Sequence, residues 1–292
     1  AILRIEYRGS TSQPSIDQLL VINDDTDPLN KTTGNPDLKP SFTQSFNLRF
    51  NNYLTNHQRF INANANFSIT SNSIANMVRY YEDTGRRETR PENINGNWNA
   101  GANIMFSSAI DSLGYFNYSV SVNDNYNHHV SYLFQDNANQ RNATNSNNFG
   151  GRLGLSYRND WLEVTLDGQM NYQHSRNELQ PTANLDTWQL NYGGQFLVRL
   201  PLDIDLSMKL HERSRRGYND DSMNTNELIW NGQISKPFLK NNSLIVALNF
   251  YDLLGQQSNY ERWVNATSRS DTQYNSVNSY AMLHVRYRLN MS

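Results

Sequence analysis

The sequence contains no cysteine among its 292 residues, which excludes disulfides and thiolate metal sites. It also has no run approaching the roughly 18 consecutive apolar residues of a transmembrane helix. The formal net charge is −2, so no excess of positive charge marks a nucleic-acid-binding surface. These absences leave neither a disulfide-stabilised module nor a helical membrane protein, and they predict no nucleic-acid partner.

The usual catalytic signatures are absent as well. The chain has no G-x-S-x-G, Walker A, H-E-x-x-H or G-x-G-x-x-G motif. Serine, histidine and acidic residues occur, but nothing in their spacing pairs them. We therefore expect no enzyme activity, no catalytic residues and no cofactor.

Asparagine is the most informative excess. The chain has 44 asparagines, with 17 tyrosines and 12 phenylalanines. Asparagine disfavours helix interiors and suits turns and loops. The mean hydropathy of −0.75 looks too polar for a membrane protein. A membrane-spanning β-strand, however, turns only every second side chain toward lipid, and the loops and the barrel interior dilute the average further.

Alternation of apolar and polar side chains is the strongest pattern that is present. Between residues 187 and 200, the apolar positions fall on one parity and the polar positions on the other, except for Leu197. Side chains of a strand point alternately to opposite faces, so this segment has one apolar and one polar face. Its length exceeds the five or six residues common in soluble folds and suits a tilted transmembrane strand, which needs about 9–11. The apolar set is Trp188, Leu190, Tyr192, Gly194, Phe196, Val198 and Leu200.

The same pattern predicts about twelve strands, and hence an all-β, antiparallel transmembrane β-barrel. Short and long connections alternate along the chain, as in outer-membrane barrels with short periplasmic turns and longer extracellular loops. Residues 9–40, 72–94 and 128–147 are among the predicted long loops. The predicted strands are 1–8, 41–53, 58–72, 95–107, 115–127, 148–158, 161–173, 187–200, 203–215, 226–236, 243–254 and 277–290.

Two sets of side chains follow from this strand assignment. Aromatic residues near strand ends predict the girdles that mark the two membrane interfaces: Tyr115, Phe116, Tyr126, Tyr157, Trp161, Tyr172 and Trp188. The polar parity predicts a lumen that binds a plug, water or a polar solute, lined by Asn62, Asn64, Asn66, Asn97, Asn99, Asn103, Asn117, Asn123, Asn191, Arg199, Lys209, His284, Arg286 and Arg288.

Several clusters suggest a ligand, although each has a simpler interpretation. The adjacent His128 and His129 would point to opposite faces of a strand, so we expect no metal site. Residues 24–27 (Asp-Asp-Thr-Asp) offer oxygens for Ca²⁺ but lack the glycine and glutamate of an EF-hand loop, which favours a solvated acidic loop. The arginines Arg86, Arg87, Arg90, Arg213, Arg215 and Arg216 lie in or beside predicted extracellular loops and offer contacts to anionic ligands or lipid phosphates.

Residues 34–40, Gly-Asn-Pro-Asp-Leu-Lys-Pro, precede a predicted strand. Asn-Pro and Lys-Pro favour turn or extended backbone, and Gly34 can adopt a positive φ, so the segment predicts a structural corner between loop and strand. The run resembles a segment of TonB-dependent outer-membrane receptors that ends an extracellular loop. Residues 7–10, 13–19, 250–254 and 280–290 are similar to further strands and loops of that family, and the asparagine-rich composition resembles its Bacteroidetes outer-membrane members.

The resemblance implies a nutrient transporter with a 22-stranded barrel and an N-terminal plug, driven by TonB. It also implies recognition of the C-terminal strand by the outer-membrane assembly machinery, and it leaves open a surface lipoprotein partner. No signal peptide is visible, and residue 1 already lies in a strand-like run. We therefore expect residues 1–292 to be the C-terminal part of one barrel domain, without the plug and the first strands.

Two alternatives remain open at this point. A complete twelve-stranded barrel, acting as a passive pore or an enzyme, would pair its first strand with its last. A soluble all-β adhesin or binding module would need no membrane at all.

Overall fold

One antiparallel sheet of twelve strands dominates the computed structural model, which describes residues 1–292 except 22–26, 265–268, 276 and 290–292. Each strand pairs with the strand that follows it in the sheet, so the predicted all-β antiparallel architecture is confirmed. The strands are β1 (Ile2–Ser12), β3 (Ser41–Leu54), β4 (Arg59–Ser71), β7 (Asn97–Ala109), β8 (Phe116–Gln135), β9 (Ala138–Arg158), β10 (Leu162–Asn177), β11 (Leu185–Leu200), β12 (Ile204–Arg216), β13 (Asn226–Phe238), β14 (Leu244–Tyr251) and β17 (Tyr280–Tyr287).

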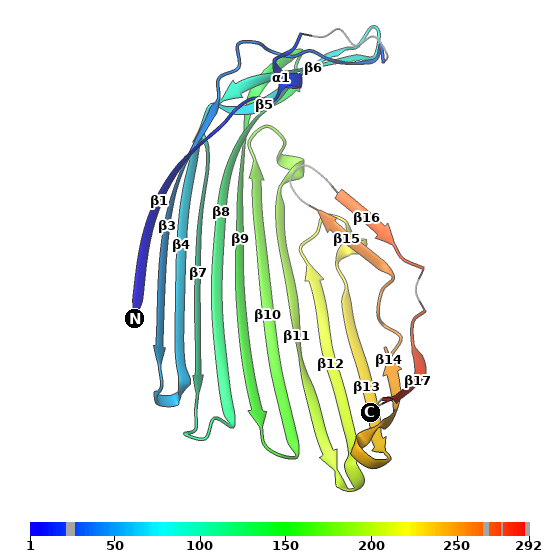
Figure 1. The fold of residues 1–292 in the computed structure, drawn as a ribbon. Coiled ribbons are helices and arrows are strands. Elements are labelled where there is room, and N and C mark those ends of the chain that lie inside the picture. The colour runs from blue at the N-terminus through cyan, green and yellow to red at the C-terminus, as the bar shows by residue number, and fades with distance from the viewer. Residues whose placement is uncertain (22–26, 265–268, 276, 290–292) are drawn as a thin grey trace.

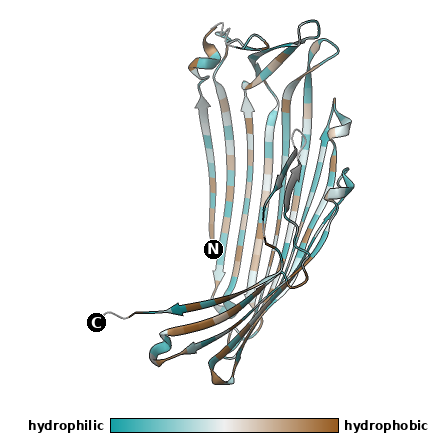
Figure 2. Ribbon diagram, turned by 90° about the vertical axis from the view of Figure 1, so that its right-hand side faces the viewer, coloured by the Kyte–Doolittle hydropathy of each residue, from teal (hydrophilic) through white to brown (hydrophobic). Residues whose placement is uncertain are grey.

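The alternation seen in the sequence forms a continuous pattern across the sheet (Figure 2). The register aligns apolar positions of neighbouring strands, for example Ile5 with Leu48 and Leu166 with both Leu155 and Gly194. Large apolar side chains on this outer face are exposed rather than buried; Ile5 is 73% exposed and Leu283 is 64% exposed. Lipid is the environment in which such a face is stable.

The sheet is strongly curved, but it does not close on itself (Figure 1). Within the part of the chain that the structure describes, strand β1 pairs with β3 alone, and β17 pairs with β14 alone. The alternative of a closed twelve-stranded barrel would require β1 to pair with β17, which the described residues do not do. The sheet is therefore a curved wall with two free edges.

Short turns join the strands at one end of the wall (Figure 1). Three of them contain a single 3₁₀ turn: η1 (Asn56–Gln58), η3 (Pro201–Asp203) and η5 (Lys240–Asn242). Non-glycine residues with positive φ make these reversals tight, among them His57, Leu202 and Asn241. The predicted short connections are thus confirmed.

Most connections at the opposite end are longer and contain structure of their own. They include α1 (Ile16–Leu19), β2 (Asn30–Thr32), the hairpin of β5 (Ser73–Tyr81) and β6 (Arg86–Ile94), η2 (Pro181–Ala183), η4 (Asp221–Met223), and the hairpin of β15 (Tyr260–Val264) and β16 (Arg269–Gln273). Strands β2, β5 and β6 form a separate three-stranded sheet above the wall (Figure 1). No helix among the described residues is long and apolar enough to cross a bilayer.

One predicted long loop was wrong. Residues 128–147 continue as the upper halves of β8 and β9, which are joined by a two-residue turn at Asp136 and Asn137. Both turn residues have positive φ, as the tightest hairpin turns require. The two strands therefore extend beyond the membrane band instead of ending at its surface.

Among the described residues, most buried apolar side chains lie toward the long-loop end, apart from Ala109 near a short turn and Ala247 within β14. Ile94 and Val130 belong to the region where the β5–β6 hairpin packs near β8. Tyr218 and Met223 are buried within the connection between β12 and β13, and Leu185 is buried at the start of β11. Hydrophobic burial therefore stabilises the loops, while the wall is held mainly by its hydrogen-bonded ladders.

Candidate functional site

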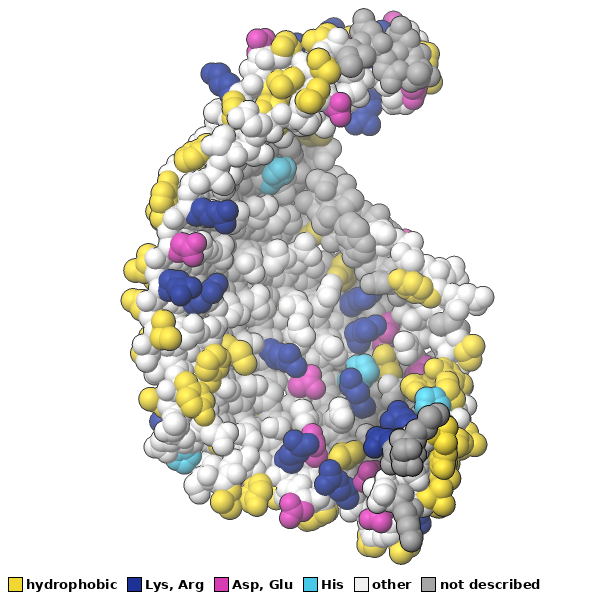
Figure 3. Space-filling view, in the orientation of Figure 1, with side chains coloured by type: hydrophobic (Ala, Val, Ile, Leu, Met, Phe, Trp, Pro, Cys, Tyr) yellow, Lys and Arg dark blue, Asp and Glu magenta, His cyan; other side chains and the backbone are white. Residues whose placement is uncertain are grey.

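The concave, luminal face of the wall carries mainly amides and hydroxyls, and Figure 3 shows charged side chains scattered among uncharged ones on it. Cross-strand register builds rows of asparagine, such as Asn64–Asn103–Asn123. Some of these amides bond to each other: Asn64 Nδ2 donates to Asn62 Oδ1 at 2.6 Å, and Asn62 donates to Asn51. The row thus presents amide donors and acceptors over several strands.

The residues predicted to line the lumen lie on this face. Register places each of them on the parity opposite to the apolar band, and Arg288 follows the end of β17 in the same alternation. The prediction missed other members that the same alternation would have identified: Asn47, Asn51, Asn125, Asn148, Asn171, Gln169, Gln173 and Gln189.

Two glycines make room for the luminal amides. A Cβ on Gly150 would lie 2.4 Å from Asn123 Oδ1, and a Cβ on Gly101 would lie 2.6 Å from both Asn66 Oδ1 and Asn125 Oδ1. Next to Gly150 the face is hollowed by a cavity of about 230 Å³, lined by Asn123, Asn148, Asn171, Phe149, Tyr172, Gln173, Thr187 and Gln189. A polar solute entering this hollow would meet donors and acceptors from several strands.

Two connections are tied to luminal strand residues at the long-loop end. Gln189 Nε2 donates to the hydroxyl of buried Tyr218 at 2.6 Å, which holds the β12–β13 connection against β11. The connection after β10 is held by Asn142, whose Oδ1 accepts from Leu179 N at 3.1 Å. These segments fix the rim of the lumen.

The Gly34–Pro40 segment is a structural corner, as predicted. Asn35 is only 2% exposed and joins three segments: its N donates to Gln18 O at 2.7 Å, its Nδ2 donates to Pro91 O at 3.0 Å, and its Oδ1 accepts from Asp37 N. Asn93 continues the connection by accepting from Lys39 N at 2.7 Å. The segment anchors α1 and the β5–β6 hairpin to the start of β3.

The predicted reason for Gly34 was wrong. The φ angle of Gly34 is not positive, but a Cβ at this position would lie 2.2 Å from Leu20 O. The glycine is needed because another part of the backbone approaches closely, and not because of a left-handed conformation. Residues 250–254, the other segment that resembles TonB-dependent receptors, also have a structural role. Buried Asp252 accepts hydrogen bonds from Gln256 N and Gln257 N.

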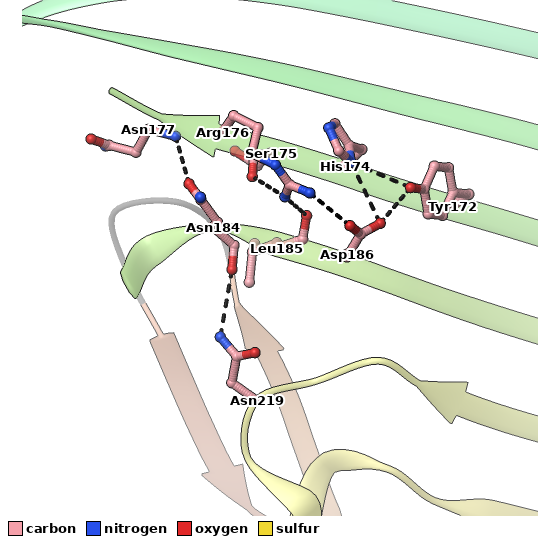
Figure 4. Close-up of polar contacts among 9 residues, drawn as sticks. All are labelled: Tyr172, His174, Ser175, Arg176, Asn177, Asn184, Leu185, Asp186 and Asn219. Carbon is pink, nitrogen blue, oxygen red and sulfur yellow. Dashed lines mark hydrogen bonds and ion pairs between the residues drawn. The ribbon is translucent and has the colours of Figure 1, made fainter. Parts of the chain in front are cut away.

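A polar cluster lies on the outer face, at the long-loop edge of the apolar band, and Figure 4 shows its contacts. Tyr172, His174 and Arg176 of β10 share the parity of the band and converge on Asp186 of β11. The Arg176 guanidinium donates to Asp186 Oδ2 at 2.9 Å and to the carbonyl oxygens of Ser175 and Leu185. These groups satisfy one another, so the cluster marks where the apolar band ends.

Aromatic side chains border the apolar band at both ends. Tyr172 and Trp188 contact each other at 4.3 Å between ring centroids, and Trp98 stacks on Tyr126 at 5.0 Å. Toward the short turns, Phe116 faces Tyr157 and Trp161 is 57% exposed. The two rows have the arrangement that the predicted girdles require, although β8 and β10 continue beyond the upper one.

The predicted clusters are dispersed by the fold. His128 lies on the outer face and His129 on the luminal face, so they cannot hold one ion together. Arg213 and Arg215 point into the lumen and Arg216 points outward, all at the long-loop end of β12. On β6, Arg86 and Arg90 pair with Glu88 and Glu92.

No three His, Asp or Glu side chains of the described residues gather as metal ligands would. Of the acidic run at 24–27, only Asp27 lies among the described residues. Its carboxylate accepts from the Asn30 side chain and from Leu29 N. These hydrogen bonds, the one from the Asn30 side chain foremost, lower the pKa of Asp27.

Residues 2–142 match the model of the outer membrane protein beta-barrel family. The matched region runs from β1 into β9 and includes the Gly34–Pro40 corner. The match indicates an outer-membrane protein, as the sequence predicted, and disfavours a soluble adhesin. No curated protein and no solved structure matches the chain.

Proposed function

We propose that this outer-membrane β-barrel chain is part of the wall of a TonB-dependent transporter that takes up a nutrient. The proposal gives the wall a static role. It holds the extracellular loops in place and encloses a plug, while TonB supplies energy by pulling on that plug. In this proposal the wall catalyses no reaction.

The observation that carries the proposal is the open sheet. In a bilayer, an unpaired strand edge costs several kcal/mol for each unsatisfied backbone group, so β1 and β17 need partners. Further strands would satisfy both edges and widen the barrel. Barrels of about 22 strands have a lumen so wide that a plug is needed, whereas about eight strands are filled by side chains alone. An unclosed wall of twelve strands therefore favours a plugged transporter over a small pore.

The long-loop end supports the same proposal. A transporter must hold its substrate on the extracellular side, and the structured excursions anchored through Asn35 and Tyr218 provide a fixed rim there. The luminal amides suit either a polar solute or the backbone of a plug.

Uptake in living cells tests this proposal. The gene encoding the protein is deleted in its bacterium, and growth is compared on a panel of single nutrients, with the gene returned as a control. We expect growth on at least one nutrient to be lost, and the same loss in a strain that lacks TonB. Growth that depends on this protein but persists without TonB would identify a passive pore instead.

A further inference from the structure

The luminal face is basic, although the whole chain is slightly acidic. On the luminal parity of the twelve strands, Lys and Arg outnumber Asp and Glu by ten to five, whereas the whole chain has 25 against 27. The acidic residues are Glu6, Glu163, Asp167, Asp205 and Glu227. The basic residues are Arg4, Arg8, Arg49, Arg152, Arg158, Arg199, Lys209, Arg213, Arg215 and Arg286.

These basic side chains are distributed along the height of the lumen. Register places Arg158 and Arg199 near the short turns, Arg152 and Lys209 at mid-height, and Arg215 near the long loops. An ion that moves through a pore needs several weak sites in succession. The distribution therefore favours a moving solute as the bound anion.

Arg4 and Arg49 form the most distinctive site. They lie directly opposite each other on β1 and β3, both facing the lumen. Like charges in that position repel each other and destabilise the strand pair unless an anion lies between them. Among the described residues, no carboxylate lies within ion-pairing distance of either guanidinium, whereas Arg158 pairs with Glu163 at 3.0 Å.

The surroundings of this pair suit an anion. A hollow of about 320 Å³ lies beside the two arginines, and its lining includes Asn47, Asn64, Asn66, Ser45 and Ser68. Guanidinium groups bind carboxylate and phosphate through paired hydrogen bonds, and amides and hydroxyls supply further donors. Glu6 also lines the hollow and limits the charge that the site can accept.

We propose that the Arg4–Arg49 hollow binds a carboxylate- or phosphate-bearing solute on its way through the lumen. The inference rests on the proposed transport function and narrows its substrate to an anion. Lys209 and the other luminal arginines, apart from Arg158 and Arg213 with their glutamate partners, raise the local concentration of such a solute along the lumen.

Binding to the full-length protein in detergent tests this inference. Three probes are titrated by calorimetry: trigalacturonate for carboxylate, inositol hexakisphosphate for phosphate, and uncharged maltotriose. We expect at least one anion to bind and maltotriose not to bind. Added salt should weaken the binding of the anion. The double variant Arg4→Gln/Arg49→Gln should bind the anion about tenfold more weakly or worse.

A matched variant separates the site from the overall charge. Arg59→Gln/Lys236→Gln removes the same charge from the outer face and should leave anion binding unchanged. Heat-modifiable migration on gels verifies that both variants fold. The inference is overturned if neither anion binds, if maltotriose binds equally well, or if the two double variants behave alike. TonB-dependent growth would survive that result, so a failure here is distinct from a failure of the transport proposal.

Discussion

Single asparagines perform three different tasks in this protein. In the lumen they form hydrogen-bonded rows, as Asn64 and Asn62 do. In tight turns they adopt positive φ, as Asn137 does. At Asn35 one buried amide holds loop segments that are distant in sequence. The amide suits all three because it is small, uncharged, and both donates and accepts.

Replacing Asn35 by alanine should loosen the loops without affecting the wall. The variant loses the bond to Pro91 O and leaves a buried acceptor unsatisfied, at a cost of about 1–3 kcal/mol. Hydrogen exchange should rise in residues 33–40 and in β6, with little change in β10. The exposed Asn76→Ala is the control. Equal exchange in the two variants would show that the buried amide does not hold the corner.

Asp111 provides a test by pH at the short-turn end. Its carboxylate accepts from Phe116 N at 2.7 Å and from Tyr115 N at 3.0 Å, and the bond from Phe116 is the main cause that holds its pKa below 3.8. A lowered folded-state pKa stabilises the turn at pH values above the unfolded pKa, and this stabilisation is lost as pH falls through the folded pKa.

Amide exchange at Phe116, corrected for its intrinsic pH dependence, should therefore accelerate only as the pH drops below about 4. Asp111→Asn, whose side chain cannot titrate, should show no such step. A step of the same size in both proteins would assign the effect to another group.

At the scale of strands, the alternation of apolar and polar residues was sufficient to predict a strand wherever one of its faces meets lipid. All twelve strands were predicted from this rule, and every residue predicted to line the lumen lies on the luminal parity, because lipid enforces a period of two. Beyond the band the rule fails. Upper β9, with Asn139, Gln140 and Asn142, has water or loops on both sides, so no alternation distinguishes it from a loop. The contacts of Asn35 were unpredictable because they depend on the tertiary position of Pro91.

The turn between β8 and β9 provides a test at this scale. Asp136 and Asn137 both have positive φ, which costs most residues about 1–2 kcal/mol and suits asparagine and glycine. Asn137→Val should destabilise the upper hairpin by about that amount, seen as faster exchange in residues 130–143. Asn137→Gly should retain the protection. A valine variant with wild-type exchange would contradict the assigned turn.

At the scale of the molecule, the wall has an apolar outer face, a basic luminal face rich in amides, and two unpaired edges. Each face follows from one parity of the same strands. The edges are what distinguish a complete small pore from part of a wide transporter, because closure of the sheet fixes the width of the barrel.

Disulfide cross-linking in the full-length protein tests most directly whether β1 and β17 are unpaired with each other. The sequence has no native cysteine that would interfere. Cysteines at Ile5 or Leu3 on β1 are combined with cysteines at Leu283 or Val285 on β17. The paired positions Ile5 with Leu48, and Leu283 with Leu248, serve as positive controls. We expect cross-links in the controls and none between β1 and β17. Efficient cross-linking of β1 to β17 would show a closed twelve-stranded barrel and contradict this expectation.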